Sequence, residues 1–199
     1  MKNSLIIVAF FTAGILFGIF IPGLRFLNKT DISRYALCGL LFLIGVGIGG
    51  DRRTQRAMRS LDLRIVLVPL AVILGTLVGS FGVALFLPGL KLREVLAVGS
   101  GFGYYSLSSV IITQIRGPVL GVIGLMANIA REIMTLLTAP LLARYLGNLA
   151  PIAAGGATAM DTTLPVIIRF SGKEYAVVAV FSGIVLTLLV PVLVTLLLR

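Results

Sequence analysis

The sequence predicts an all-α polytopic membrane protein, and its composition and the lengths of its apolar runs are the basis of that prediction. Of the 199 residues, 58% are hydrophobic and 12% are charged, whereas a soluble domain has about 25% charged and about 45–50% apolar residues. The apolar residues gather into runs near the roughly 20 residues that a membrane-spanning helix needs. We therefore expect about six transmembrane helices plus a re-entrant or discontinuous segment, with broken helices near the bilayer midplane.

Three regular spans are expected in the first half of the chain, at Ser4–Ile21, Tyr35–Gly50 and Ile65–Leu87. In the third, Gly75 and Gly79 form a GxxxG pair, which either permits close helix packing or arises by chance in a glycine-rich chain. We expect residues 1–90 to form a three-helix membrane repeat unit and residues 91–199 to form a core transport unit.

The formal net charge of +10 fits a membrane protein better than a nucleic-acid-binding one. Basic residues lie between apolar runs, most densely in the loop Asp51–Arg64. Such a loop contacts anionic lipid headgroups, and each basic residue near the membrane surface contributes about 1 kcal/mol of attraction. We expect it to be cytoplasmic, and we expect the lipid bilayer, not nucleic acid, as the partner of these charges.

Several enzyme and metal classes are excluded by missing residue types. The chain has no histidine, which excludes histidine-based zinc sites and Ser-His-Asp catalysis. Its single cysteine, Cys38, excludes an internal disulfide. An intramembrane aspartyl protease often uses a GxGD turn, which Gly49-Gly50-Asp51 misses by one position. We expect no enzyme activity, no metal and no cofactor.

The second half contains two segments that are too interrupted to be simple spans, Val95–Ile115 and Asn148–Arg169. Pro165 and the residues before it favour a half-helix that starts near Pro165. In many transporters two such breaks are paired and build one central site. The alternative for the first segment is tight packing of its small residues against another helix, and the alternative for the second is an ordinary loop. The candidate site residues here are Gly101, Gly103, Tyr105, Ser106, Ser108, Asp161, Thr162 and Thr163.

Two long spans complete the second half, at Val119–Ala143 and Tyr175–Leu197. The first has two charges near its middle, about 20 Å from its start at 1.5 Å per residue. Ions inside a membrane are functional by default, although Arg131 could instead form a structural ion pair, for example with Asp161. The polar stripe on this helix comprises Asn128, Arg131, Glu132 and Thr135.

Three segments in order resemble the signature segments of the LysO-type lysine exporter family, together with Pro191 in the last span. The resemblance covers essentially the whole chain and is strongest over Val95–Val192. The segments are Ser100–Ser108, Asn128–Glu132 and Gly155–Val166.

The resemblance implies an inner-membrane exporter of L-lysine, driven by protons, that also accepts thialysine. Glu132 and Asp161 match the family's intramembrane acids; one would take the ε-ammonium and the other the proton. Carbonyls and hydroxyls around Gly101–Ser109, with Asn128, would bind the α-ammonium of lysine. Backbone amides of the half-helix near Asp161–Pro165 would bind its carboxylate.

Full-length members of that family are similar but have a further three-helix segment, which would make this chain the long half of a split exporter with inverted repeats. A small three-helix family partner or a second copy of the chain, in a homodimer, would complete it. A passive cation channel and a non-transporting membrane assembly subunit are the alternative functions.

Overall fold

The computed structural model describes residues 63–199 and five isolated helical positions before them, 35, 39, 42, 46 and 50. The chain divides into two compact units, Met1–Ile44 and Gly45–Arg199, and the architecture below belongs to the second. Apart from those isolated positions, the first two expected spans and the basic loop up to residue 62 lie outside the described residues. The division at residue 90 stays a prediction.

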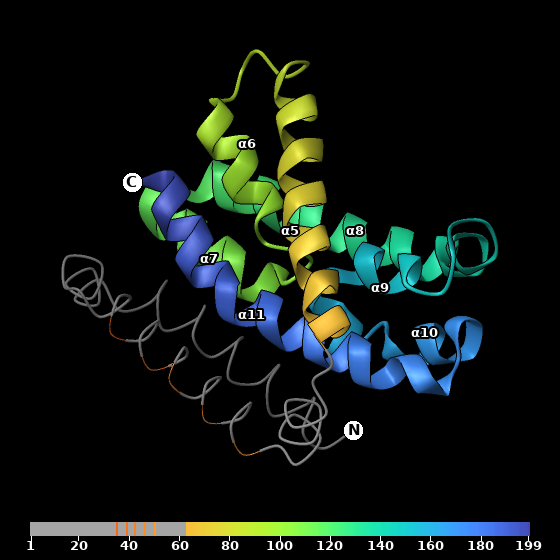
Figure 1. The fold of residues 1–199 in the computed structure, drawn as a ribbon. Coiled ribbons are helices and arrows are strands. Elements are labelled where there is room, and N and C mark those ends of the chain that lie inside the picture. The colour runs from red at the N-terminus through yellow and green to blue at the C-terminus, as the bar shows by residue number, and fades with distance from the viewer. Residues whose placement is uncertain (1–34, 36–38, 40–41, 43–45, 47–49, 51–62) are drawn as a thin grey trace, which may run out of the picture. The chain divides into compact units, whose positions relative to one another are not determined.

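Residues 63–199 fold into helices joined by short turns, without a strand (Figure 1). Four of these helices end at a glycine with positive φ, namely Gly117, Gly147, Gly156 and Gly172, because glycine adopts that conformation without a Cβ clash. The elements are α5 (Leu63–Ala84), α6 (Leu92–Gly99), α7 (Tyr105–Arg116), α8 (Pro118–Leu146), α9 (Ala150–Gly155), η2 (Gly156–Met160), α10 (Leu164–Ser171), η3 (Lys173–Tyr175) and α11 (Ala176–Leu198).

Three helical stretches of this region are long and apolar enough to cross a membrane: Ile65–Ala84, Pro118–Leu146 and Lys173–Leu198. They coincide with three of the expected spans and confirm an all-helical membrane protein in the described region. The boundaries differ slightly. Residues 63 and 64, expected in the basic loop, already begin α5, and residues 85–87 form a turn after it.

The last helix, α11, is the central element of this unit and contacts α5, α6, α7 and η2. In Figure 1, α6 and α7 lie on one side of α5, and α9 and α10 lie on the other. A buried apolar cluster packs α9, η2 and α10 against α11. Its central residues are Ile152, Ala159, Ile167 and Ala179.

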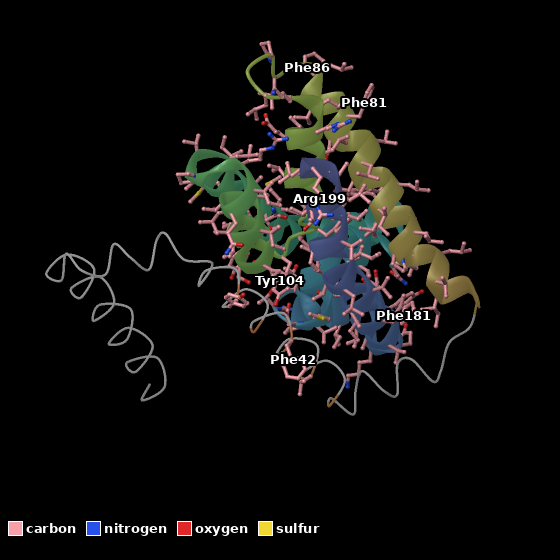
Figure 2. The ribbon with its side chains drawn as sticks, turned by 90° about the vertical axis from the view of Figure 1, so that its left-hand side faces the viewer. Phe42, Phe81, Phe86, Tyr104, Phe181 and Arg199 are labelled. Atoms are coloured by element: carbon pink, nitrogen blue, oxygen red, sulfur yellow. The ribbon has the colours of Figure 1, made fainter. Side chains whose placement is uncertain are left out.

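Large apolar side chains also cover the outside of the unit, as expected for surfaces that face lipid. Figure 2 shows Phe81 and Phe86 standing out from the end of α5 and the turn after it; they are 49% and 84% exposed. Phe181 on α11 is only 7% exposed. The core therefore lies around α11, and α5 presents an apolar outer face.

Candidate functional site

The first interrupted segment is two short helices joined by a buried turn. The helices α6 and α7 have 8 and 12 residues, so at 1.5 Å per residue neither alone crosses a hydrocarbon core of about 30 Å. In the turn, Phe102 and Gly103 have φ values of 47° and 92°, and the Phe102 side chain is completely buried. The turn is therefore part of the protein interior and not a surface loop.

The second interrupted segment is also discontinuous. The helix α9 ends at Gly155, the 3-10 helix η2 follows, and α10 begins at Leu164 with Pro165 in its first turn. This agrees with the half-helix expected to start near Pro165. Gly156, at the junction of α9 and η2, has a φ of 63°.

The two breaks meet each other. The N–H of Ala157 donates a hydrogen bond to the carbonyl oxygen of Phe102, at 2.9 Å. A Cβ atom on Gly156 would collide with that same carbonyl, so the crossing requires glycine for space as well as for its positive φ. The two interrupted segments are therefore paired, as the sequence predicts, and their irregular backbone is buried in protein, as it must be wherever such backbone lies inside a bilayer.

The side-chain amide of Asn128 on α8 fastens the first break to that helix. Its Nδ2 donates to the carbonyl oxygens of Gly124 (2.8 Å) and Val98 (3.2 Å), and its Oδ1 accepts the N–H of Gly103 (2.7 Å). Asn128 is 2% exposed. Both N–H groups of the amide donate and its oxygen accepts one bond, so the side chain holds three backbone groups in place. Only one acceptor lone pair, on Oδ1, remains free.

Arg131, near the middle of α8, caps the C-terminal end of α9. Its Nε and Nη2 donate to the carbonyl oxygens of Ala154 (2.9 Å) and Ala153 (3.1 Å), and its Nη1 donates to Thr76 Oγ1 (3.2 Å). The last carbonyls of a helix lack intrahelical partners and form the negative end of its dipole. The guanidinium donates hydrogen bonds to two of these carbonyls and places a positive charge at the negative end of the dipole.

The alternative of an Arg131–Asp161 ion pair is wrong. Within the described part of the chain, no carboxylate forms an ion pair with Arg131. Two of its three partners are backbone carbonyls, which every residue carries, so the sequence could not reveal them.

An open groove of about 650 Å³ lies between α5, α6, α8 and α9, and we call it the polar groove. Its volume is in the range of small-molecule sites, about 300–1,000 Å³. It contains most of the polar stripe expected on α8, but not Glu132. The lining residues are Ala71, Val72, Gly75, Thr76, Gly79, Ser80, Val83, Val95, Val98, Gly99, Ala127, Asn128, Arg131, Met134, Thr135, Thr138, Ala153 and Ala154.

The wall formed by α5 is the part of the groove that sequence analysis missed. A Cβ on Gly75 or Gly79 would meet nothing within 4 Å, so this GxxxG pair opens space and does not pack against a described helix. Thr76 and Ser80 repeat the same spacing of four, which places them beside the glycines on the helix. That repeat of small and hydroxyl residues was the available signal.

The two candidate acids lie in different surroundings. Glu132 on α8 is half-buried and makes no hydrogen bond or ion pair with any residue that the structure describes. Asp161 is exposed at the end of η2, and its Oδ1 accepts the N–H of Thr162 at 2.6 Å.

The remaining candidates divide into buried and accessible groups. Ser108 is buried and donates to the carbonyl oxygen of Tyr104 at 2.9 Å. Thr163 is buried at the N-cap position of α10, where its side chain makes no capping bond. Of the other hydroxyl residues, Tyr105 is half-buried and Ser106 and Thr162 are exposed.

The contacts bring five of the predicted residues together around the crossing. The N–H of Gly103 donates to Asn128, and a Cβ on Gly101 would lie 2.5 Å from the Asn128 side chain and 2.7 Å from that of Ser108. Arg131 approaches Gly156 in the same way. Within the described region, no hydrogen bond joins these five residues directly to the remaining candidates, although Thr158 lies between Gly103 and Thr163. The remaining candidates are Tyr105, Ser106, Glu132, Asp161, Thr162 and Thr163.

The amides at the start of α10, which the sequence suggested for a carboxylate, are already occupied. Pro165 has no N–H. The other donors each have an acceptor: Thr162 in Asp161 Oδ1, Thr163 in the Thr158 carbonyl, Leu164 in the Asp161 carbonyl, and Val166 and Ile167 in the Thr163 carbonyl. This helix start therefore leaves no free backbone donor for an anion.

Comparison with known proteins places this fold in a family. The family model described as "Lysine exporter LysO" matches residues 8–198. The lysine exporter LysO of Escherichia coli (strain K12) is 36% identical over 179 residues, which are 89% of this chain and 59% of the relative. The chain thus spans about 59% of the length of that relative.

A second relative is a Haemophilus influenzae protein named for lysine export, 34% identical over 170 residues, which are 85% of both chains. No solved structure matches. The family match covers nearly the whole chain and includes both breaks, Asn128 and Arg131. The chain therefore belongs to the LysO lysine exporter family, a family of transporters.

Proposed function

We propose that the protein is a secondary-active exporter that moves L-lysine, and analogues such as thialysine, across the inner membrane in exchange for protons. The observation that carries this proposal is the crossing of the two broken segments, where Ala157 meets Phe102, next to a polar groove. Discontinuous helices that meet in this way form substrate sites in many secondary transporters. The names of the two relatives supply the substrate and the direction.

Glu132 is the acid best suited to the coupled proton. It lies near the middle of α8 and has no partner among the described residues. A lone carboxylate is costly inside a membrane, so it favours binding a proton or an ammonium group. Antiport requires that protonation of Glu132 and binding of lysine exclude each other.

Asp161 is then the acid for the ε-ammonium of lysine, since it is exposed at the second break. The α-ammonium is assigned to carbonyl and hydroxyl oxygens of the first break, among Gly101–Ser109 and next to Asn128, of which the hydroxyls of Tyr105 and Ser106 are the accessible ones. Thr162, also exposed, lies next to Asp161. These side chains are at least partly accessible, although the Thr162 hydroxyl donates to Asp161 Oδ1 at 3.4 Å and the Ser106 hydroxyl is hydrogen-bonded to Tyr104, whereas Ser108 and Asn128 are engaged with the backbone.

We further propose that a second set of helices completes the transporter, supplied either by a small three-helix family partner or by a second copy of this chain. The basis is the share of each relative that the match covers, which is 59% for the E. coli relative and 85% for the H. influenzae relative. The longer relative therefore has sequence that this chain does not match.

Counterflow of labelled lysine into lysine-loaded liposomes tests the proposal, with this chain alone and then with a candidate three-helix partner. Transient accumulation by the chain alone supports a complete site in a homodimer, and accumulation only with the partner supports a two-part exporter. Equilibration without accumulation would indicate a passive channel. No lysine movement with either well-folded preparation would contradict lysine export and favour an assembly subunit.

A further inference from the structure

The positive charge of Arg131 is the starting point. Three of its N–H groups donate to two carbonyls of α9 and to Thr76, and no described acid neutralises it. A guanidinium has five N–H groups, so one on each terminal nitrogen remains available. A cation in the middle of a spanning helix is costly, and neutral carbonyls offset that cost only in part.

The surroundings of this charge suit an anion. Arg131 lines the polar groove, which has no Asp or Glu among the lining residues that the structure describes. On the facing helix α5, the hydroxyl of Thr76 accepts a bond from Arg131, and its own O–H has no acceptor in the described region. The hydroxyl of Ser80 likewise has no hydrogen bond there. The Thr76 hydroxyl is therefore a donor next to the guanidinium, and the Ser80 hydroxyl is a second one on the same wall of the groove, one turn further along α5 and against Gly99.

We propose that the polar groove binds the α-carboxylate of the transported amino acid, with the free N–H groups of Arg131 as its main donors and Thr76 and Ser80 beside them. This inference rests on the proposed function and deepens it. Arginine matches the planar geometry of a carboxylate better than any other side chain. The competing position, the start of α10, has no free amide.

The first test uses the unchanged protein, together with whichever partner transport requires. Labelled lysine is bound, and unlabelled lysine or lysinamide, which lacks the carboxylate, competes. We expect lysinamide to compete at least about tenfold less well, corresponding to the loss of one charged contact. Equal competition would overturn the carboxylate site but leave lysine export intact, whereas no lysine binding at all would overturn both.

The second test assigns the site to the groove by filling it. Gly79→Val places a side chain into the groove at a position where a Cβ meets nothing within 4 Å, so the fold should tolerate it. Gly82→Val is the matched control, because Gly82 lies on the same helix in open space but does not line the groove. We expect Gly79→Val to weaken lysine binding at least about tenfold and Gly82→Val to leave it unchanged. Wild-type binding by Gly79→Val would overturn the assignment.

The third test addresses the guanidinium itself. Arg131→Gln should abolish the preference for lysine over lysinamide, whereas Arg144→Gln removes the same charge from the exposed end of α8 and should preserve it. If Arg131→Gln does not fold after losing the cap on α9, Arg131→Lys retains the charge but not the fork of donors. That variant should still reduce the preference. A full preference in a folded Arg131 variant would refute the role of Arg131.

Discussion

Gly156→Ala tests the crossing of the two breaks most sharply. Gly156 has φ 63° and ψ −123°, a conformation that costs a non-glycine residue about 1–3 kcal/mol. The new Cβ would also collide with the Phe102 carbonyl, and such overpacking typically costs a further 1–3 kcal/mol, roughly. We therefore expect the free energy of unfolding to fall by about 2–6 kcal/mol in total.

Gly147→Ala is the matched control for this substitution. Gly147 also has a positive φ, 91°, but a Cβ there would meet nothing within 4 Å. Gly147→Ala should therefore lower the free energy of unfolding only by the cost of the backbone conformation, about 1–3 kcal/mol. Titration with SDS in mixed micelles, followed by circular dichroism, measures both variants. Equal losses for the two would refute the steric contact at the crossing, because backbone strain alone would then account for the effect.

Three further substitutions test other contacts. Asn128→Leu leaves the buried N–H of Gly103 without an acceptor and should cost about 1–3 kcal/mol in the same titration; a loss too small to measure would contradict the clamp. Glu132→Gln should abolish lysine transport driven by a pH gradient while changing stability by less than about 0.5 kcal/mol, and retained coupled transport would exclude this proton carrier. Arg116→Gln removes the 3.0 Å bond to the Leu198 carbonyl and should speed amide exchange only in the last turn of α11, at a cost below about 1 kcal/mol; unchanged exchange there would contradict the cap.

The positions of the breaks were predictable because their causes are local. Glycines at 99, 101 and 103 and Pro165 interrupt helices through their own backbone preferences. The long apolar runs likewise fixed the three spans of the described region to within a few residues. Composition and the lengths of the apolar runs together predicted the all-helical membrane class.

The partners of the polar groups were not predictable in the same way. The Asn128 amide and the Arg131 guanidinium both bond to backbone carbonyls that are distant in sequence, and a carbonyl has no signature in the amino-acid order. The ion pair considered for Arg131 was an inference from charge alone, and charge identifies only other side chains.

The wall of the groove on α5 shows a second kind of ambiguity. A glycine that admits a neighbouring helix and a glycine that borders a cavity look identical in a sequence. Gly75 and Gly79 fit a packing motif, yet they face open space in the described unit. Only the three-dimensional arrangement of α5, α6, α8 and α9 shows which applies.

The most direct test of lysine–proton exchange is the internal pH of liposomes that contain the complete transporter. Lysine is added outside, and the membrane potential is held at zero with potassium and valinomycin. The account predicts that lysine entry makes the interior more alkaline as protons leave, and that Glu132→Gln abolishes this change. Entry of labelled lysine without a change in internal pH would contradict proton antiport and indicate a passive path.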